Sequence, residues 1–291
     1  MRSMTGLFWA LALIGGLCAS AAQAHDKSTF CFTIIPDDDE GSHNVEPLTK
    51  MAEQLQAKLG VPVKFVPAIT SSAATKAFTS NEVQLGWFGG FMGVRVRHQA
   101  PDSQALAQTA EDAAFRFYLI THDKTGLKPS KDFPKEIAGK SFTFGGRTST
   151  SGRLMPEYFI RQAFGRSPEE VFSRVGFSGD QSLTIQLVQA GAFEVGAVSS
   201  LVWNLDQKGR TKLGPVSAIW ESPPFPHYQW TIRGDVDATF GTGFTERVRA
   251  ALLSIDDPAI LGVFGGSKFI PANNEAYEPI EEVAKINGHL P

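Results

Sequence analysis

Short apolar segments of β-strand character alternate along this chain with segments whose apolar residues recur at helical spacing. In residues 45–59, Leu48, Met51 and Leu55 lie three or four positions apart, and Gly60 follows as a helix-ending residue. This alternation favours a largely parallel sheet with helices on both faces. In the first part of the chain we expect strands at 30–35, 61–66, 83–88 and 115–121, and helices at 45–59, 73–78 and 91–99.

The same alternation begins again near residue 141, and a length of 291 residues suits two domains. The predicted class is α/β, with two mixed, mostly parallel sheets and flanking helices. Here we expect strands at 141–144, 171–177 and 193–198, an extended segment at 228–232, and helices at 155–164, 182–190, 201–208 and 245–253. We expect residues 25–120 plus 228–291 to form lobe 1 and residues 121–227 to form lobe 2. The chain should cross near 117–121 and 225–231, with its C-terminal tail on lobe 1.

The first 24 residues have the parts of a secretory signal peptide. Arg2 supplies the positive charge, Leu7–Ile14 the apolar core, and Ala22–Ala24 an A-x-A cleavage pattern. We therefore expect an exported protein, cleaved after Ala24. Cleavage would leave Cys31 as the single cysteine, which excludes an internal disulfide. Because Cys31 lies in an apolar predicted strand, we expect a buried structural thiol.

A hydroxyl-rich turn, Thr148–Gly152, separates the predicted strand 141–144 from the predicted helix that starts near residue 153. The first N–H groups of a helix lack intrahelical partners, and the helix dipole favours negative charge there. One hydroxyl would suffice as a helix cap, whereas this turn carries four. The turn therefore predicts an oxyanion site.

Charge and histidine spacing narrow the function further. Removing residues 1–24 removes Arg2 and no acid, so the formal charge of -3 becomes -4, which excludes a strongly basic nucleic-acid binder. The six histidines show no metal-binding spacing, and the acidic run Asp37–Glu40 is more typical of a solvated loop than of a cation site. We expect no metal and no cofactor. A hydrolase with Ser151 as nucleophile would need a base and an orienting group, and no G-x-S-x-G motif is present.

Several motifs together resemble the substrate-binding proteins of ABC importers, specifically the phosphonate/phosphite-binding type. Within that family the chain looks most like the branch described as selenate-binding proteins. The motifs that carry the resemblance are Ile34–Asp37, Leu85–Gly90, Phe144–Gly152, Phe177–Gly179, Trp220–Pro224 and Ser267–Pro271. The resemblance implies a two-lobed, hinged type II periplasmic binding fold that captures a small oxyanion such as phosphonate, phosphite or selenate. It also implies a periplasmic monomer that delivers its ligand to a membrane permease and is not an enzyme. The alternative is an oxyanion sensor, arsenite included, that presents its ligand to a membrane histidine kinase.

The resemblance also implies site residues. Ser149, Thr150, Ser151 and Gly152 would hold the oxyanion, Phe88, Gly90 and Phe91 would line the cleft, and His227 and Tyr228 would reach it from the Pro-rich return segment. Two departures favour a small ligand, or one held by neutral hydrogen bonds. Gln181 stands where the family pattern Ser-Gly-x-His has histidine, and Thr70–Ser72 replace an expected tyrosine. We include Gln181 in the predicted site.

The export signal leads to a first prediction. Expression of the full chain in a Gram-negative host should yield a periplasmic protein whose first residue is His25, because Ala22–Ala24 matches the cleavage pattern. Intact-mass measurement checks this. A product in the periplasm that still carries Met1 would contradict cleavage after Ala24.

Overall fold

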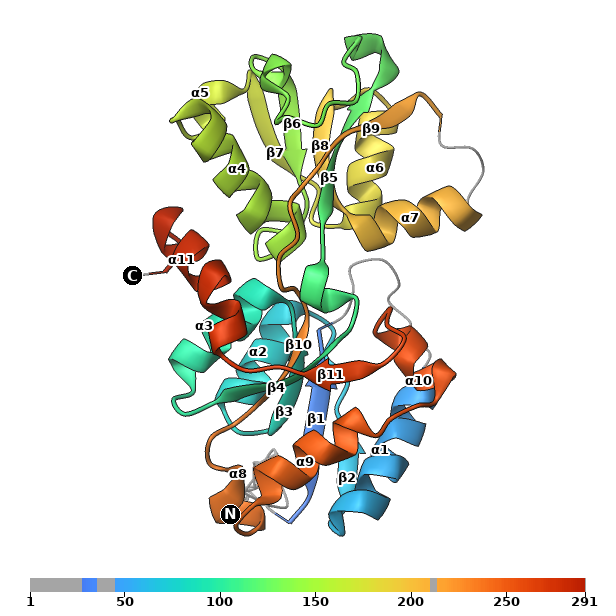
Figure 1. Ribbon diagram of the computed structural model, residues 1–291, viewed down its shortest axis with the longest axis vertical. Coiled ribbons are helices and arrows are strands. Elements are labelled where there is room, and N and C mark those ends of the chain that lie inside the picture. The colour runs from blue at the N-terminus through green and yellow to red at the C-terminus, as the bar shows by residue number, and fades with distance from the viewer. Residues whose placement is uncertain (1–27, 36–44, 210–213, 291) are drawn as a thin grey trace, which may run out of the picture.

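The chain forms two lobes linked by two connecting segments (Figure 1). The computed structural model describes residues 28–35, 45–209 and 214–290. One lobe is built on a six-stranded sheet and the other on a five-stranded sheet, which confirms the predicted pair of mixed sheets. The predicted signal peptide and the acidic run Asp37–Glu40 lie outside the described residues.

The six-stranded sheet has the order β11-β4-β10-β3-β1-β2. Its strands are β1 (Phe30–Ile34), β2 (Val63–Phe65), β3 (Leu85–Phe88), β4 (Gln104–Thr109), β10 (Gln229–Ile232) and β11 (Phe269–Pro271). Its helices are α1 (Val45–Leu59), α2 (Ser71–Thr79), α3 (Gly90–Gln99), α8 (Val236–Phe240), α9 (Phe244–Leu253) and α10 (Pro258–Val263). Strands β2, β1 and β3 pair in parallel. Strands β10, β4 and β11 extend the sheet by antiparallel pairing.

Alternation along the strands builds one core on each face of this sheet. On β1, Phe30 and Phe32 face the cluster under α1, α9 and α10, whereas Cys31 faces the smaller cluster under α2 and α3. The Cys31 side chain is 1% exposed, which confirms the buried thiol, and burial raises its pKa. The helical spacing of α1 is confirmed as well, because Leu48 and Met51 are fully buried against the sheet.

The five-stranded sheet has the order β7-β6-β8-β5-β9, with β7, β6 and β8 parallel and β5 and β9 antiparallel to their neighbours. Its strands are β5 (Phe117–His122), β6 (Ser141–Phe144), β7 (Arg174–Phe177), β8 (Val195–Ser199) and β9 (Val216–Glu221). Its helices are α4 (Met155–Phe164), α5 (Pro168–Val171), α6 (Gln181–Gln189) and α7 (Ser200–Gly209). Short 3₁₀ turns are η1 (Asp112–Ala114), η2 (Asp123–Thr125), η3 (Lys135–Ile137) and η5 (Glu275–Tyr277), and η4 (Thr150–Leu154) is a π-helical turn.

Three features differ from the sequence predictions. The predicted crossing at 117–121 is strand β5, which pairs with β8 and β9, so residue 120 lies inside the five-stranded sheet. The chain passes between the sheets at 110–116 and 222–228 instead. The predicted strand region 171–177 begins with the end of α5, because Ser167 and Glu170 form a capping box that starts a helix. Strand β4 was not predicted.

The C-terminal tail contacts both lobes. Strand β11 pairs with β4 in the six-stranded sheet, as the predicted docking on lobe 1 requires. Helix α11 (Glu278–Ile286) lies between α3 and α4 (Figure 1). Beyond it, Asn287 Nδ2 donates to the Leu154 carbonyl at 3.0 Å, and His289 Nε2 lies 2.8 Å from Glu157 Oε2. The tail therefore contacts both lobes, whereas the sequence predicted contact with lobe 1 alone.

A core substitution tests the packing of α1. Leu48→Ala should lower the free energy of unfolding by about 2–5 kcal/mol, because it removes a fully buried side chain and leaves a cavity. Ile286→Ala is the control: this side chain is 64% exposed, and its loss should change stability by less than about 0.5 kcal/mol. Urea unfolding followed by circular dichroism measures both. Equal effects of the two substitutions would contradict the described packing.

Candidate oxyanion-binding site

The hydroxyl-rich turn follows β6 and starts a helix, as predicted. Ser149 has an extended backbone (φ -70°, ψ 134°), and its Oγ accepts a hydrogen bond from the Gly152 N–H at 3.0 Å. The Leu154 N–H then donates to the Ser149 carbonyl five residues back, which makes η4 a π-helical turn that continues into α4. Such turns are frequently found at functional sites. The Thr150 and Ser151 N–H groups stand at the helix start, where intrahelical acceptors are missing.

The hydroxyl groups of this turn face inward, toward three other segments. Thr150 and Ser151 are 2% and 1% exposed. The Thr150 Oγ1 accepts a hydrogen bond from the Phe91 N–H at 3.0 Å, across the gap between η4 and the start of α3 in the other lobe. The Ser151 Oγ lies 3.2 Å from His227 Nε2 and 3.4 Å from Gln181 Nε2. The structure thus brings together five of the residues predicted for the site, with Phe91 contributing only its backbone N–H.

Gln181, the first residue of α6, is held in one orientation. Its Oε1 accepts a hydrogen bond from the Ser199 N–H at 3.0 Å. Its Nε2 is therefore directed at the hydroxyls of Ser149, at 3.3 Å, and Ser151, at 3.4 Å. Where the family pattern has histidine, this chain places a neutral amide donor.

Gly152 is required by close packing of the turn. A Cβ atom there would lie 2.8 Å from Gln181 Nε2, 3.0 Å from Ser149 Oγ and 3.3 Å from Gly145 Cα. In the structure, the direct obstacles are Gln181, Ser149 and the Gly145 backbone.

His227 and Tyr228 lie on the segment that returns to the six-stranded sheet, and Asp112 of η1 fixes both. The Asp112 carbonyl accepts from the His227 N–H at 3.0 Å, and its Oδ1 accepts from the Tyr228 N–H at 3.1 Å. The His227 ring stacks on Phe115, with centroids 4.0 Å apart and planes 14° apart. Asp112 was missed at the sequence level because the two residues that link it to the site, His227 and Tyr228, are far along the chain.

Three cavities meet around Tyr228. One of about 230 Å³ is bordered by Gly89, Arg147 and the turn residues 148–150, and a smaller one of about 50 Å³ by Ser149, Ser151 and Gln181. His227 and Tyr228 line both. The donors predicted to hold an oxyanion therefore face these two spaces.

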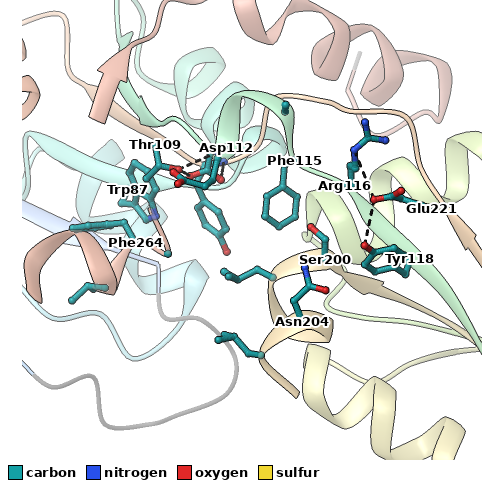
Figure 2. Close-up of a pocket in the computed structure, with 17 residues that line it drawn as sticks. Trp87, Thr109, Asp112, Phe115, Arg116, Tyr118, Ser200, Asn204, Glu221 and Phe264 are labelled. Carbon is teal, nitrogen blue, oxygen red and sulfur yellow. Dashed lines mark hydrogen bonds and ion pairs between the residues drawn. The ribbon is translucent and has the colours of Figure 1, made fainter. Parts of the chain in front are cut away.

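The third cavity, of about 360 Å³, is lined by Tyr228 and Phe115 as well. Trp87 and Phe264 stand on one side of it, with Arg116, Tyr118 and Glu221 on the opposite side (Figure 2). The Trp87 and Tyr228 rings stack in parallel, 5.7 Å apart. The hydroxyl-rich turn does not line this cavity, so its volume alone does not make it the anion site.

Two predicted cleft residues lie elsewhere. Phe88 is fully buried in the core under α2 and α3, with its ring 5.3 Å from that of Phe78. The reason is strand alternation: Trp87 faces the cavity side, so Phe88 points to the opposite face of β3. The Phe91 ring is also buried, and only its backbone N–H reaches the hydroxyl turn. Gly90 starts α3, where a Cβ atom would lie 3.1 Å from the Pro226 carbonyl oxygen.

The two arginines beside the turn both place their guanidinium groups over the Phe177 ring. The Arg153 side chain is 12% exposed and pairs with Glu157 at 2.9 Å. Burial lowers its pKa, and Glu157 opposes that shift. Arg147 is exposed and lies over the Phe177 ring, 3.8 Å from its centroid. Within residues 28–35, 45–209 and 214–290, no group of three His, Cys, Asp or Glu side chains is arranged to hold a metal ion.

Gly152→Ala tests the turn. The added methyl group should displace the Gln181 amide and weaken oxyanion binding, because it would lie 2.8 Å from Nε2. Gly262→Ala in α10 is the matched control, since nothing lies within 4 Å of a Cβ atom there, and it should leave binding unchanged. Thermal unfolding with and without methylphosphonate measures both variants. Full ligand-induced stabilisation of Gly152→Ala would contradict the described packing.

Comparisons with known proteins agree with this architecture. The family model described as "ABC transporter, phosphonate, periplasmic substrate-binding protein" matches residues 32–277. The probable phosphite-binding protein PhnD1 of an ABC transporter in Prochlorococcus marinus is 35% identical over 242 residues, which cover 80% of this chain and 82% of that protein. The phosphonates-binding periplasmic protein of Escherichia coli is 22% identical, over 95% of this chain and 82% of that protein.

Solved structures show the same fold. The structure of P. marinus PhnD1 in complex with methylphosphonate has a TM-score of 0.79 and 33% identity, covering 91% of this chain and all of that chain. In the part of the chain that the structure describes, no helix combines the length and apolar character needed to cross a membrane. Since the family model spans most of the chain, this protein belongs to the periplasmic substrate-binding proteins of phosphonate ABC transporters, which bind a substrate and are not enzymes.

Proposed function

We propose that this protein binds phosphite or a small phosphonate between its lobes and delivers it to an ABC importer. The observation that carries the proposal is the convergence of Ser151, Gln181 and His227 at the start of a helix. Hydroxyl, amide and imidazole groups all donate hydrogen bonds to oxyanions, and the helix start adds backbone donors. The relatives named for phosphite and phosphonates support the same ligand class.

The donor set favours a small ligand held largely by neutral groups. Among the described residues, Arg153 is paired with Glu157 and Arg147 lies at the surface over Phe177. The two spaces bordered by the turn have volumes of about 230 and 50 Å³, below the usual range for drug-sized ligands. Because the relatives are named for phosphite and phosphonates, we place phosphite and methylphosphonate ahead of selenate.

Binding should close the lobes. The oxyanion would contact the hydroxyl turn of one lobe, and Thr150 already accepts from the Phe91 N–H of the other. Rotation about the connections at 110–116 and 222–228 is the expected motion, of the hinge type. Because one chain carries both lobes and therefore the whole cleft, we propose that the protein is a monomer. We also propose that the signal peptide is cleaved after Ala24. Because the relative at 35% identity is a transport protein, we propose delivery to a permease rather than presentation to a sensor kinase.

Substitution of Ser151 tests this site. Ser151→Ala should weaken binding of phosphite and methylphosphonate by about 1–3 kcal/mol, because a hydrogen bond to a charged acceptor is lost. Thr150→Ala should weaken binding similarly and also removes the acceptor for the Phe91 N–H. Calorimetric titration gives the affinities.

Ser167→Ala is the control for these variants. Ser167 caps α5 in the same lobe, away from the cleft, so affinity should match that of the unmodified protein. Unchanged affinity in both Ser151→Ala and Thr150→Ala would rule out the hydroxyl turn as the site.

A further inference from the structure

A buried carboxylate stands behind His227, on the side opposite the hydroxyl turn. His227 and Asp112 are each 3% exposed. The Nδ1 atom of His227 lies 3.6 Å from Asp112 Oδ1, within ion-pair range, whereas its Nε2 lies 3.2 Å from Ser151 Oγ. The imidazole is thus placed between a carboxylate and the proposed oxyanion site.

Both oxygens of the Asp112 carboxylate accept hydrogen bonds. Its Oδ1 accepts from the Tyr228 N–H, and its Oδ2 accepts from the Thr109 hydroxyl at 2.5 Å. The pKa of Tyr277 is raised well above its usual value by burial and then by the negative charge of Asp112. Tyr277 therefore stays a neutral donor, with its hydroxyl on the Tyr228 carbonyl.

Aromatic rings and two charged residues that are engaged elsewhere make up the other surroundings of His227. Its ring is stacked on Phe115 and meets the Tyr228 ring edge-on. Asp180 and Arg147 border the two small cavities that His227 also lines. Asp180 caps α6 through the Leu183 N–H, and Arg147 is exposed over Phe177. An imidazolium can also be stabilised by an aromatic face such as that of Phe115.

We infer that oxyanion binding is proton-coupled: His227 binds the ligand as an imidazolium, and Asp112 is the positioning residue that keeps it in that form. The inference rests on the proposed function and adds the charge state of the site. The imidazolium carries one proton on each ring nitrogen. Nδ1–H lies on the side of Asp112, and Nε2–H lies on the side of the ligand. No Arg or Lys among the described residues is then needed inside the site to neutralise the ligand.

The sign of the pH dependence follows. A bound oxyanion stabilises the imidazolium, so His227 holds its proton to higher pH in the complex than in the free protein. Affinity is therefore full at low pH and falls as pH rises, by about tenfold per pH unit while the free protein has lost the proton and the complex has kept it. Replacing the Asp112 carboxylate by an amide removes a stabilising negative charge, so this fall should begin at lower pH.

The experiment measures methylphosphonate affinity by calorimetry from pH 5 to 9. We compare the unmodified protein with Asp112→Asn, His227→Gln and Glu111→Gln. Asp112→Asn should shift the alkaline fall to lower pH, and His227→Gln should abolish it, leaving the pH dependence of the ligand itself. Glu111→Gln is the matched control, because this neighbouring carboxylate accepts from the Ser267 N–H instead and should leave the profile unchanged.

A measurement on the unmodified protein covers the case in which Asp112→Asn fails to fold. At the pH where affinity falls, calorimetry in two buffers of different ionisation enthalpy should report about one proton taken up per ligand, after correction for the free ligand. Absence of uptake would overturn the inference, as would an Asp112→Asn profile lowered equally at every pH. If the unmodified protein binds without proton uptake but Ser151→Ala loses affinity, the proposed function stands and only the proton coupling fails. Failure of the inference is therefore distinguishable from failure of the proposed function.

Discussion

The pairing of the two connecting segments is the constraint on which the rest of the structure depends. Phe115 and Phe225 exchange two backbone hydrogen bonds, of 3.0 and 2.9 Å, where the chain passes between the sheets. Asp112, just before this pair, binds the backbone of His227 and Tyr228. The point about which the lobes would move therefore also positions two side chains of the proposed site, so hinge geometry and ligand contacts are physically linked.

The proposed site derives its affinity for anions from a few local groups rather than from the net charge of the protein. The chain is formally acidic, and Arg153, beside the hydroxyl turn, is paired with Glu157. Hydroxyls, an oriented amide, a helix start and the inferred His227 imidazolium act instead, over short distances in a buried space where each donor counts more than it would in water. Such a site discriminates by geometry, because an unmatched buried donor costs about 1–3 kcal/mol.

The local parts of this site were predictable from sequence, and the nonlocal parts were not. The strand, the hydroxyls and Gly152 are contiguous, so their order alone predicts a strand-to-helix turn. Phe88 was wrongly predicted to line the cleft. Side chains alternate along β3, so either Trp87 or Phe88 can face the cavities, and the sequence does not show which face of the sheet the helices cover. Asp112 was missed because it acts through His227, which is remote in the chain.

By itself, the sequence determined the two α/β units, the helix spacing of α1, the buried thiol of Cys31 and the strand-to-helix turn at residues 149–152. Each of these depends on residues within about one element of each other. Tertiary structure decided where the chain crosses between the lobes, how α11 joins them and which groups surround His227. These depend on strand pairing and on contacts between distant segments, whose partners are selected by packing of the whole molecule and leave no mark in local sequence.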